Sequence, residues 1–173
     1  MINSPRLFLR ALETSDVELM YEVENDELSW RYSDTVAPLS RHLLKEYAST
    51  YDANPFKSGQ LRLIVISKES NIPVGIVDLY EISQRHSRAF VGIYILPEFR
   101  NKGYAKETLN LIENFAFQTL HLHQLAAKVE DKNRSSEILF TNNGYEMNAY
   151  LKDWLSSTNG DFLSMKIFTK ILS

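Results

Sequence analysis

The sequence contains no cysteine, few glycines and no long apolar run, and each absence excludes a class of protein. Without cysteine there is no disulfide, no thiolate zinc site and no cysteine nucleophile. Six glycines in 173 residues are too few for a glycine-rich repeat. No stretch approaches the roughly 18 apolar residues of a membrane span, and residues 1–10 lack the apolar core of a signal peptide. We therefore expect a cytoplasmic protein.

An excess of positive charge is missing as well. Nineteen Lys and Arg residues against 22 Asp and Glu residues give a net charge of -3, which argues against a nucleic-acid or anionic-membrane binder. His121 and His123 form an HxH pair, but no carboxylate recurs beside them at helical metal-ligand spacing, so we expect no metal site.

Apolar residues follow strand and helix periods along most of the chain. They predict strands at residues 6–12, 60–68, 74–82, 89–96, 124–129, 145–151 and 162–170. They predict helices at about 17–23, 40–51, 106–120 and 135–142. No linker rich in Pro, Gly or Ser divides the chain. The order βααβββαβαββ predicts one α/β (α+β) domain over residues 1–173, with a mixed sheet.

The segment that joins the strand at 89–96 to the helix at 106–120 carries the clearest chemical signal. The first turn of a helix leaves N–H groups unpaired and carries partial positive charge, which suits an anion. Gly103 allows close backbone approach, and Arg100, Lys102 and Lys106 add positive charge. Neither a Walker loop nor a three-glycine dinucleotide fingerprint is present. The segment suits a polyphosphate ligand, although an ordinary turn with a solvated basic face would show the same pattern.

Residues 100–105, RNKGYA, match the (R/Q)xxGx(G/A) signature of the GNAT superfamily of acyl-CoA N-acyltransferases. The element order and the segment DKNRSSEILFTNNGYE at 131–146 agree with that family. Within it, VGIVDLYEIS, ILPEFRNKGYAKETL and SMKIF most resemble the bacterial ribosomal-protein alanine and spermidine N-acetyltransferase group. The resemblance implies the GNAT fold: a mixed, mostly antiparallel six- to seven-stranded sheet with helices on both faces.

The resemblance also implies acetyl-CoA as the cofactor and transfer of its acetyl group to a primary amine. In the family the pantetheine arm pairs with the fourth strand, and the diphosphate lies on the signature loop. The amine attacks directly, through a tetrahedral intermediate, whose oxyanion the backbone of Ile95 would stabilise here. The expected coenzyme A residues are Ile93, Tyr94, Ile95, Leu96, Arg100, Asn101, Lys102, Gly103, Tyr104, Ala105, Asn133, Ser136 and Phe140.

Two carboxylates on the strand at 74–82 are candidates for the general base that an amine with a pKa of about 10.4 requires. Asp78 and Glu81 are three residues apart, so a regular strand would point them to opposite faces unless a bulge intervenes. Glu81 lies nearer the end where acceptors enter and is favoured slightly. Either residue also fits a solvent-facing strand carboxylate.

Phe140 stands where many family members have a tyrosine that protonates the leaving thiolate. Because Phe140 has no hydroxyl, either another tyrosine takes that role or the thiolate leaves unaided. Tyr94, Tyr104 and Tyr145 are the candidates. A thiol pKa of about 8.5 makes the thiolate a fair leaving group near neutral pH.

Acidic residues dominate the N-terminal part of the chain. Residues 13–34 contain eight of them and one basic residue, Arg31. Glu18, Glu22 and Asp26 stand four apart on one helix face, where like charges repel. Because the first helices flank the acceptor groove in the family, we expect a cationic acceptor, either a polyamine such as spermidine or a protein N-terminus.

The expected substrate residues are Glu22, Asp26, Trp30 and Tyr32. Two observations favour other interpretations. A solvated helix face explains the acidic residues equally well, and Phe90 replaces an acid of the spermidine-like pattern, which counts against a polyamine.

The alternative function is an acyl-CoA-binding GNAT-fold protein with weak or lost catalysis, acting as a sensor or interaction module, which Phe140 favours. A further alternative is an interaction domain that binds no coenzyme A. The expected partners are a small-molecule amine or a peptide N-terminus, with no nucleic acid and no membrane. The sheet edges would allow a homo-oligomer, whose stoichiometry the sequence does not fix.

Overall fold

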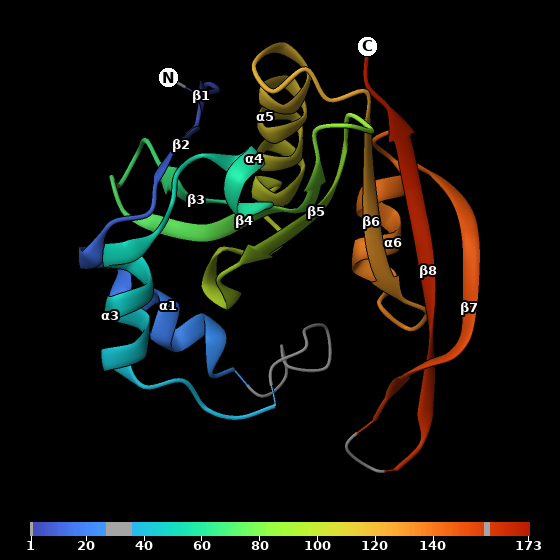
Figure 1. Cartoon of the computed structure of the whole chain (residues 1–173), viewed down its shortest axis with the longest axis horizontal. Helices are drawn as coiled ribbons and strands as arrows, with labels where there is room; N and C mark the ends of the chain where they lie inside the picture. The colour runs from blue at the N-terminus through green and yellow to red at the C-terminus, as the bar shows by residue number, and fades with distance from the viewer. Residues whose placement is uncertain (1, 27–35, 158–159) are drawn as a thin grey trace.

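A computed structural model of the chain describes residues 2–26, 36–157 and 160–173. These residues form an open eight-stranded sheet in the order β1-β2-β3-β4-β5-β6-β8-β7 (Figure 1). Neighbouring strands are antiparallel apart from β5 and β6, which are parallel. The strands are β1 (Ile2–Asn3), β2 (Leu7–Ala11), β3 (Leu61–Ser67), β4 (Pro73–Ser83), β5 (Arg88–Ile95), β6 (Gln124–Glu130), β7 (Glu146–Ser156) and β8 (Phe162–Ile171).

Polar side chains cap several of the helices that cover the sheet. Ser40 accepts a hydrogen bond from the N–H of Leu43, and Asn133 accepts one from the N–H of Ser136. Gly103 begins the longest described helix. The helices are η1 (Thr14–Asp16), α1 (Val17–Glu24), α3 (Arg41–Thr50), α4 (Pro55–Ser58), η2 (Pro97–Phe99), α5 (Tyr104–Gln118) and α6 (Arg134–Thr141). None of the described helices is long and apolar enough to cross a membrane.

Alternation along the central strands builds a core on each face of the sheet. Ile64 and Ile76 pack in one cluster with Met20 of α1 and Leu44 of α3. Their strand neighbours pack in a second cluster against α5, whose buried residues include Leu109 and Ile112. Helices α1 and α3 therefore cover one face, which is called the α1 face below, and α5 covers the other (Figure 1).

The element order agrees with the prediction, but the strand count is eight rather than six to seven. The additional strand, β1, pairs with β2 through only two residues, which is too short for a periodic pattern. Strand β7 also continues to Ser156, well past the predicted end at residue 151. A register shift between Leu151 and Leu155, with Asp153 at φ 51°, interrupts the alternation without ending the strand.

Strands β5 and β6 pair over a short distance and then separate. Their partners are Arg88 with Gln124, Ala89 with Leu125 and Phe90 with Ala126, whereas β5 continues to Ile95 and β6 to Glu130. Beyond Phe90 the edge of β5 that faces β6 has lost its strand partner, so its backbone groups border an opening in the sheet.

Candidate active site

A cleft of about 590 Å³ occupies the opening between β5 and β6. Its walls come from α1, β3, β4, α6, β7 and β8 as well as from the two separated strands. Six of the predicted site residues line it together, namely Asp78, Ile93, Tyr94, Asn133, Ser136 and Phe140. The cleft is thus the place where residues from distant parts of the predicted site meet.

The signature loop at 100–105 bends through two left-handed residues before α5. Asn101 has φ 60° and Gly103 has φ 82°, and Gly103 is the N-cap of α5. A Cβ atom at Gly103 would lie 3.3 Å from Nη2 of Arg6. The unpaired N–H groups of the first helical turn and the missing side chain at Gly103 make this end of α5 fit a diphosphate.

Arg6 holds this loop in place through hydrogen bonds, and the sequence did not indicate this role. Its Nη1 donates to the backbone oxygen of Lys102 at 3.0 Å, and its Nε donates to Glu107 on α5 at 2.7 Å. Arg100 is turned toward β5, where its Nε donates to the backbone oxygen of Ile95 at 2.9 Å. A separation of about a hundred residues hides the Arg6 contacts from any local motif.

The α6 wall of the cleft contains Asn133, Ser136 and Phe140. The side-chain oxygen of Asn133 accepts from the Ser136 N–H at 3.1 Å and so caps the helix. Phe140 is buried, and its ring centroid lies 5.0 Å from that of Tyr145 in an edge-on arrangement. The residue at the usual tyrosine position therefore forms an apolar part of the wall.

The three tyrosines proposed to replace the missing hydroxyl lie in different environments. Tyr145 is buried, and burial, followed by the negative charge of Glu113, raises its pKa, so it remains protonated. Tyr104 packs against Phe99. Tyr94 lines the cleft, and its hydroxyl donates to Asp26 at 3.2 Å. Of the three, Tyr94 is the one in the cleft wall.

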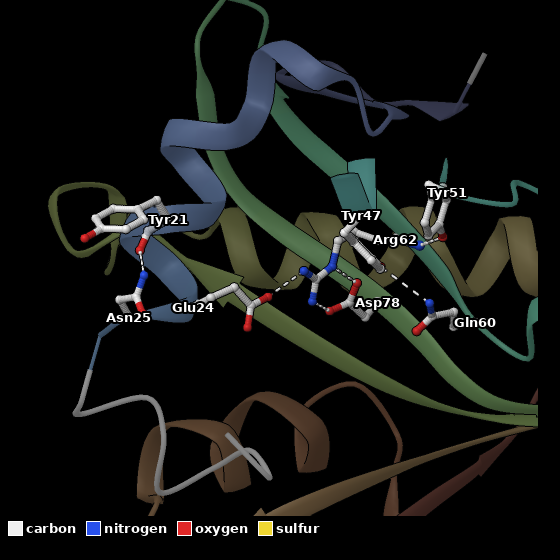
Figure 2. A network of polar contacts seen from close by, with 8 residues as sticks. All are labelled: Tyr21, Glu24, Asn25, Tyr47, Tyr51, Gln60, Arg62 and Asp78. Atoms are coloured by element: carbon white, nitrogen blue, oxygen red, sulfur yellow. Dashed lines mark hydrogen bonds and ion pairs between the residues drawn. The ribbon is translucent and has the colours of Figure 1, made fainter. Parts of the chain in front are cut away.

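Arg62 of β3 joins two carboxylates at the α1 face of the cleft (Figure 2). Its Nε and Nη2 donate to the two oxygens of Asp78 on β4, each at 2.9 Å, and its Nη1 donates to Glu24 on α1 at 2.5 Å. Burial disfavours the guanidinium charge, but Asp78 and Glu24 outweigh it and raise the pKa of Arg62. Both Asp78 oxygens therefore hold hydrogen bonds from a permanent cation.

A bulge changes the direction of Glu81, the other predicted base. The β4–β5 register shifts between Tyr80 and Ser83, and Glu81 itself has φ 49°. Its Oε1 accepts from Nζ of Lys128 on β6 at 2.6 Å. Both predicted bases are thus ion-paired, Asp78 with Arg62 and Glu81 with Lys128.

Several acidic residues of α1 and of the segment before it pair with arginines. Glu18 pairs with Arg41 of α3 at 2.9 Å, and Asp16 pairs with Arg10 of β2 at 2.7 Å. Asp26 lies within hydrogen-bond distance of Tyr94. Trp30 and Tyr32, which were predicted to contact the acceptor, lie outside the described residues. Within the described ranges, no three His, Asp or Glu side chains are grouped so that they could hold a metal ion.

Residues 6–146 match the family described as Acetyltransferase (GNAT) domain. A spermidine N(1)-acetyltransferase of Vibrio cholerae is 26% identical over 148 residues, which cover 84% of this chain and 82% of that protein. The ribosomal protein uS5-alanine N-acetyltransferase of Escherichia coli K12 is 26% identical over 156 residues, 79% of each chain.

The structural comparison agrees with these matches. A crystal structure of spermidine N-acetyltransferase from Vibrio cholerae, in complex with CoA and spermine, superposes with a TM-score of 0.87 at 25% identity. The alignment covers 98% of this chain and 97% of that one. The chain therefore belongs to the GNAT acetyltransferase family, and both the fold class and the resemblance predicted from the sequence are confirmed.

Proposed function

We propose that this GNAT N-acetyltransferase is a cytoplasmic enzyme that transfers the acetyl group of acetyl-CoA to the primary amine of a cationic acceptor, through one domain spanning residues 1–173. The observation that carries the proposal is the cleft between β5 and β6. The N-terminus of α5 follows β5 on one side of this cleft, and carboxylates from α1 and β4 line its other side.

Acetyl-CoA would lie along the free edge of β5, with residues 93–96 beside the pantetheine and residues 100–105 around the diphosphate. Asn133 and Ser136 would border the pantetheine from α6. Its thioester supplies the activated acetyl group, and the protein residues orient that group toward the amine.

The direction of one backbone N–H supports Ile95 as the oxyanion donor. Leu96 donates its N–H to the backbone oxygen of Val74 on β4 at 3.0 Å. Because successive N–H groups along a strand point to opposite edges, the N–H of Ile95 points away from β4, toward the cleft. A donor fixed in this way needs no rearrangement as negative charge develops on the thioester oxygen.

Proton removal from the amine is assigned to Glu81. At pH 7 an ordinary alkylamine is neutral in only about one molecule in 10³·⁴, a deficit of about 4.6 kcal/mol, so a proton acceptor is required. Both oxygens of Asp78 accept from Arg62, whereas one oxygen of Glu81 pairs with Lys128 and its side chain is 55% exposed. Glu81 therefore keeps a second oxygen, which would take up the proton through intervening water, since Glu81 itself is not among the residues that line the cleft.

Phe140 and Tyr94 line the cleft, and a leaving thiolate there would lie beside them. Phe140 cannot donate a proton. With a thiol pKa of about 8.5 the thiolate can leave unaided near neutral pH, and the Tyr94 hydroxyl is the donor that we assign for its later protonation.

Comparison of two glycines tests the coenzyme site. Gly103→Ala should weaken acetyl-CoA binding at least about tenfold in calorimetry, because the new methyl group obstructs the diphosphate. Gly59→Ala is the matched control, since Gly59 has φ 73° and open space around it. Equal affinities in the two variants would contradict the diphosphate assignment.

An acceptor panel with acetyl-CoA tests the reaction, with release of the coenzyme A thiol as the readout. The panel contains butylamine, 1,4-diaminobutane, spermidine, a peptide with a free N-terminus and an acidic amine. We expect turnover with cationic amines. Turnover with the acidic amine alone would refute the cationic acceptor, and binding of acetyl-CoA without any turnover would favour the sensor function, for which the paired carboxylates and Phe140 are the structural arguments.

A further inference from the structure

On the α1 face of the cleft, the ammonium group of Lys128 lies among two aromatic rings and a carboxylate. The rings of Tyr80 and Phe90 stack with centroids 5.5 Å apart and planes 21° apart. Nζ of Lys128 lies 4.6 Å from the Phe90 centroid and 5.4 Å from the Tyr80 centroid. The same nitrogen lies 2.6 Å from Oε1 of Glu81. Two ring faces and a carboxylate are the groups that bind alkylammonium ions.

The fold places this site where the two central strands begin to separate. Phe90 and Ala126 form the last β5–β6 pair, and Lys128 is the next residue of β6 on the side of Ala126. Lys128 and Tyr80 both line the cleft. The bulge at Glu81 brings its carboxylate to the Lys128 ammonium. The Lys128 ammonium thus lies where β5 and β6 begin to separate, on the face from which the acceptor would approach.

We infer that Lys128 is a specificity-determining residue, because its ammonium fills the position that a second ammonium group of the acceptor would take. Resting on the proposed function, this inference narrows the acceptor to a cation with a single ammonium group in the cleft, such as a monoamine or a peptide N-terminus. A diamine or polyamine would have to bring a second charge against Lys128, and like charges at such short range repel.

A second cation on the same face supports the inference independently. Arg62 binds Asp78 and Glu24, two carboxylates of the cleft wall. A cation of the chain itself thus engages Asp78 and Glu24, two carboxylates that would otherwise be available to a polyamine. The α1 face of the cleft is rich in acidic residues, but ion pairs within the protein neutralise much of their charge.

A titration with propylammonium chloride tests the site without catalysis. Lys128→Ala vacates the space above the rings, whereas Lys128→Met removes the charge and keeps a side chain of similar length there. Propylammonium should bind Lys128→Ala at least about tenfold more tightly than it binds Lys128→Met or the unaltered protein. Adding Glu81→Gln to Lys128→Ala should remove most of that gain. Equal binding by Lys128→Ala and the unaltered protein would overturn the inference, because removal of the Lys128 ammonium would then open no site for another one.

The acceptor preference is measured with the same variants. The ratio of kcat/KM for 1,4-diaminobutane to that for butylamine should rise about tenfold in Lys128→Ala and less in Lys128→Met. An unchanged ratio would also overturn the inference. The two proposals fail in different ways. No turnover with any amine would refute the proposed transferase reaction, while the propylammonium titration would still report on the Lys128 site.

Discussion

Substitution of Arg62 tests how much its ion pairs at the α1 face of the cleft contribute to the stability of the protein. Arg62→Met removes a guanidinium that makes three hydrogen bonds to Asp78 and Glu24. The side chains of Arg62 and Glu24 are each 19% exposed and that of Asp78 is 29% exposed, so water replaces the lost partner poorly. Breaking a largely buried ion pair from one side costs about 3–5 kcal/mol, and we expect a loss of that size in the free energy of unfolding.

Urea unfolding followed by circular dichroism measures this loss, with an exposed ion pair as the control. Lys57 pairs with Asp52 at 2.8 Å, but their side chains are 77% and 37% exposed. Lys57→Met should therefore cost less than about 1 kcal/mol. Adding Glu24→Gln and Asp78→Asn to Arg62→Met should recover a large part of the loss, because no unpaired carboxylate is then left behind.

A cost no greater than that of Lys57→Met would refute the role given to Arg62.

Three further substitutions test other parts of the site. Gly75→Ala would place a Cβ against the backbone oxygen of Tyr94 and 3.1 Å from the Cα of Ile95, so it should destabilise the protein by about 1–3 kcal/mol and weaken acetyl-CoA binding; unfolding and calorimetry check this. Although burial opposes ionisation, hydrogen bonds from Ser4 and Arg6 lower the pKa of Glu107, so its stabilisation is present above the unfolded pKa and lost as pH falls. Glu107→Gln should therefore be less stable than the unaltered protein at pH 7, and thermal melts should show the gap closing in acid. Phe140→Tyr should change kcat by less than about twofold if the thiolate leaves unaided, and a large increase would show that thiolate protonation limits the reaction.

The sequence predicted the central strands because each of their apolar residues packs in the core on one face of the sheet only. Along β3 to β6 alternate residues contact either α1 and α3 or α5, and this produces the strand pattern. The elements that were missed carry no such pattern. β1 has two residues and α4 has four, while the bulge around Asp153 interrupts the alternation of β7.

The parts of the site that a single segment forms could be predicted from the sequence. The parts that depend on how strands pair could not. The signature loop and Gly103 could be located because helix-terminus chemistry is local. The partner of Asp78, by contrast, follows from the β3–β4 register, which sets Arg62 opposite Asp78. The direction of Glu81 follows from one extra residue in β4 relative to β5, which the spacing of Asp78 and Glu81 alone does not reveal.

The acidic N-terminal region shows how folding changes the charge that an acceptor meets. The sequence between residues 13 and 34 carries one basic residue, and that imbalance favoured a polycation. In the folded chain Asp16, Glu18 and Glu24 each pair with an arginine that lies outside this stretch. Each pair removes one negative charge from the field that an approaching acceptor meets. Since Lys128 likewise engages Glu81, attraction within the cleft should be strongest for a compact acceptor with one ammonium group, and steering of the acceptor should depend on salt less than the sequence alone suggests.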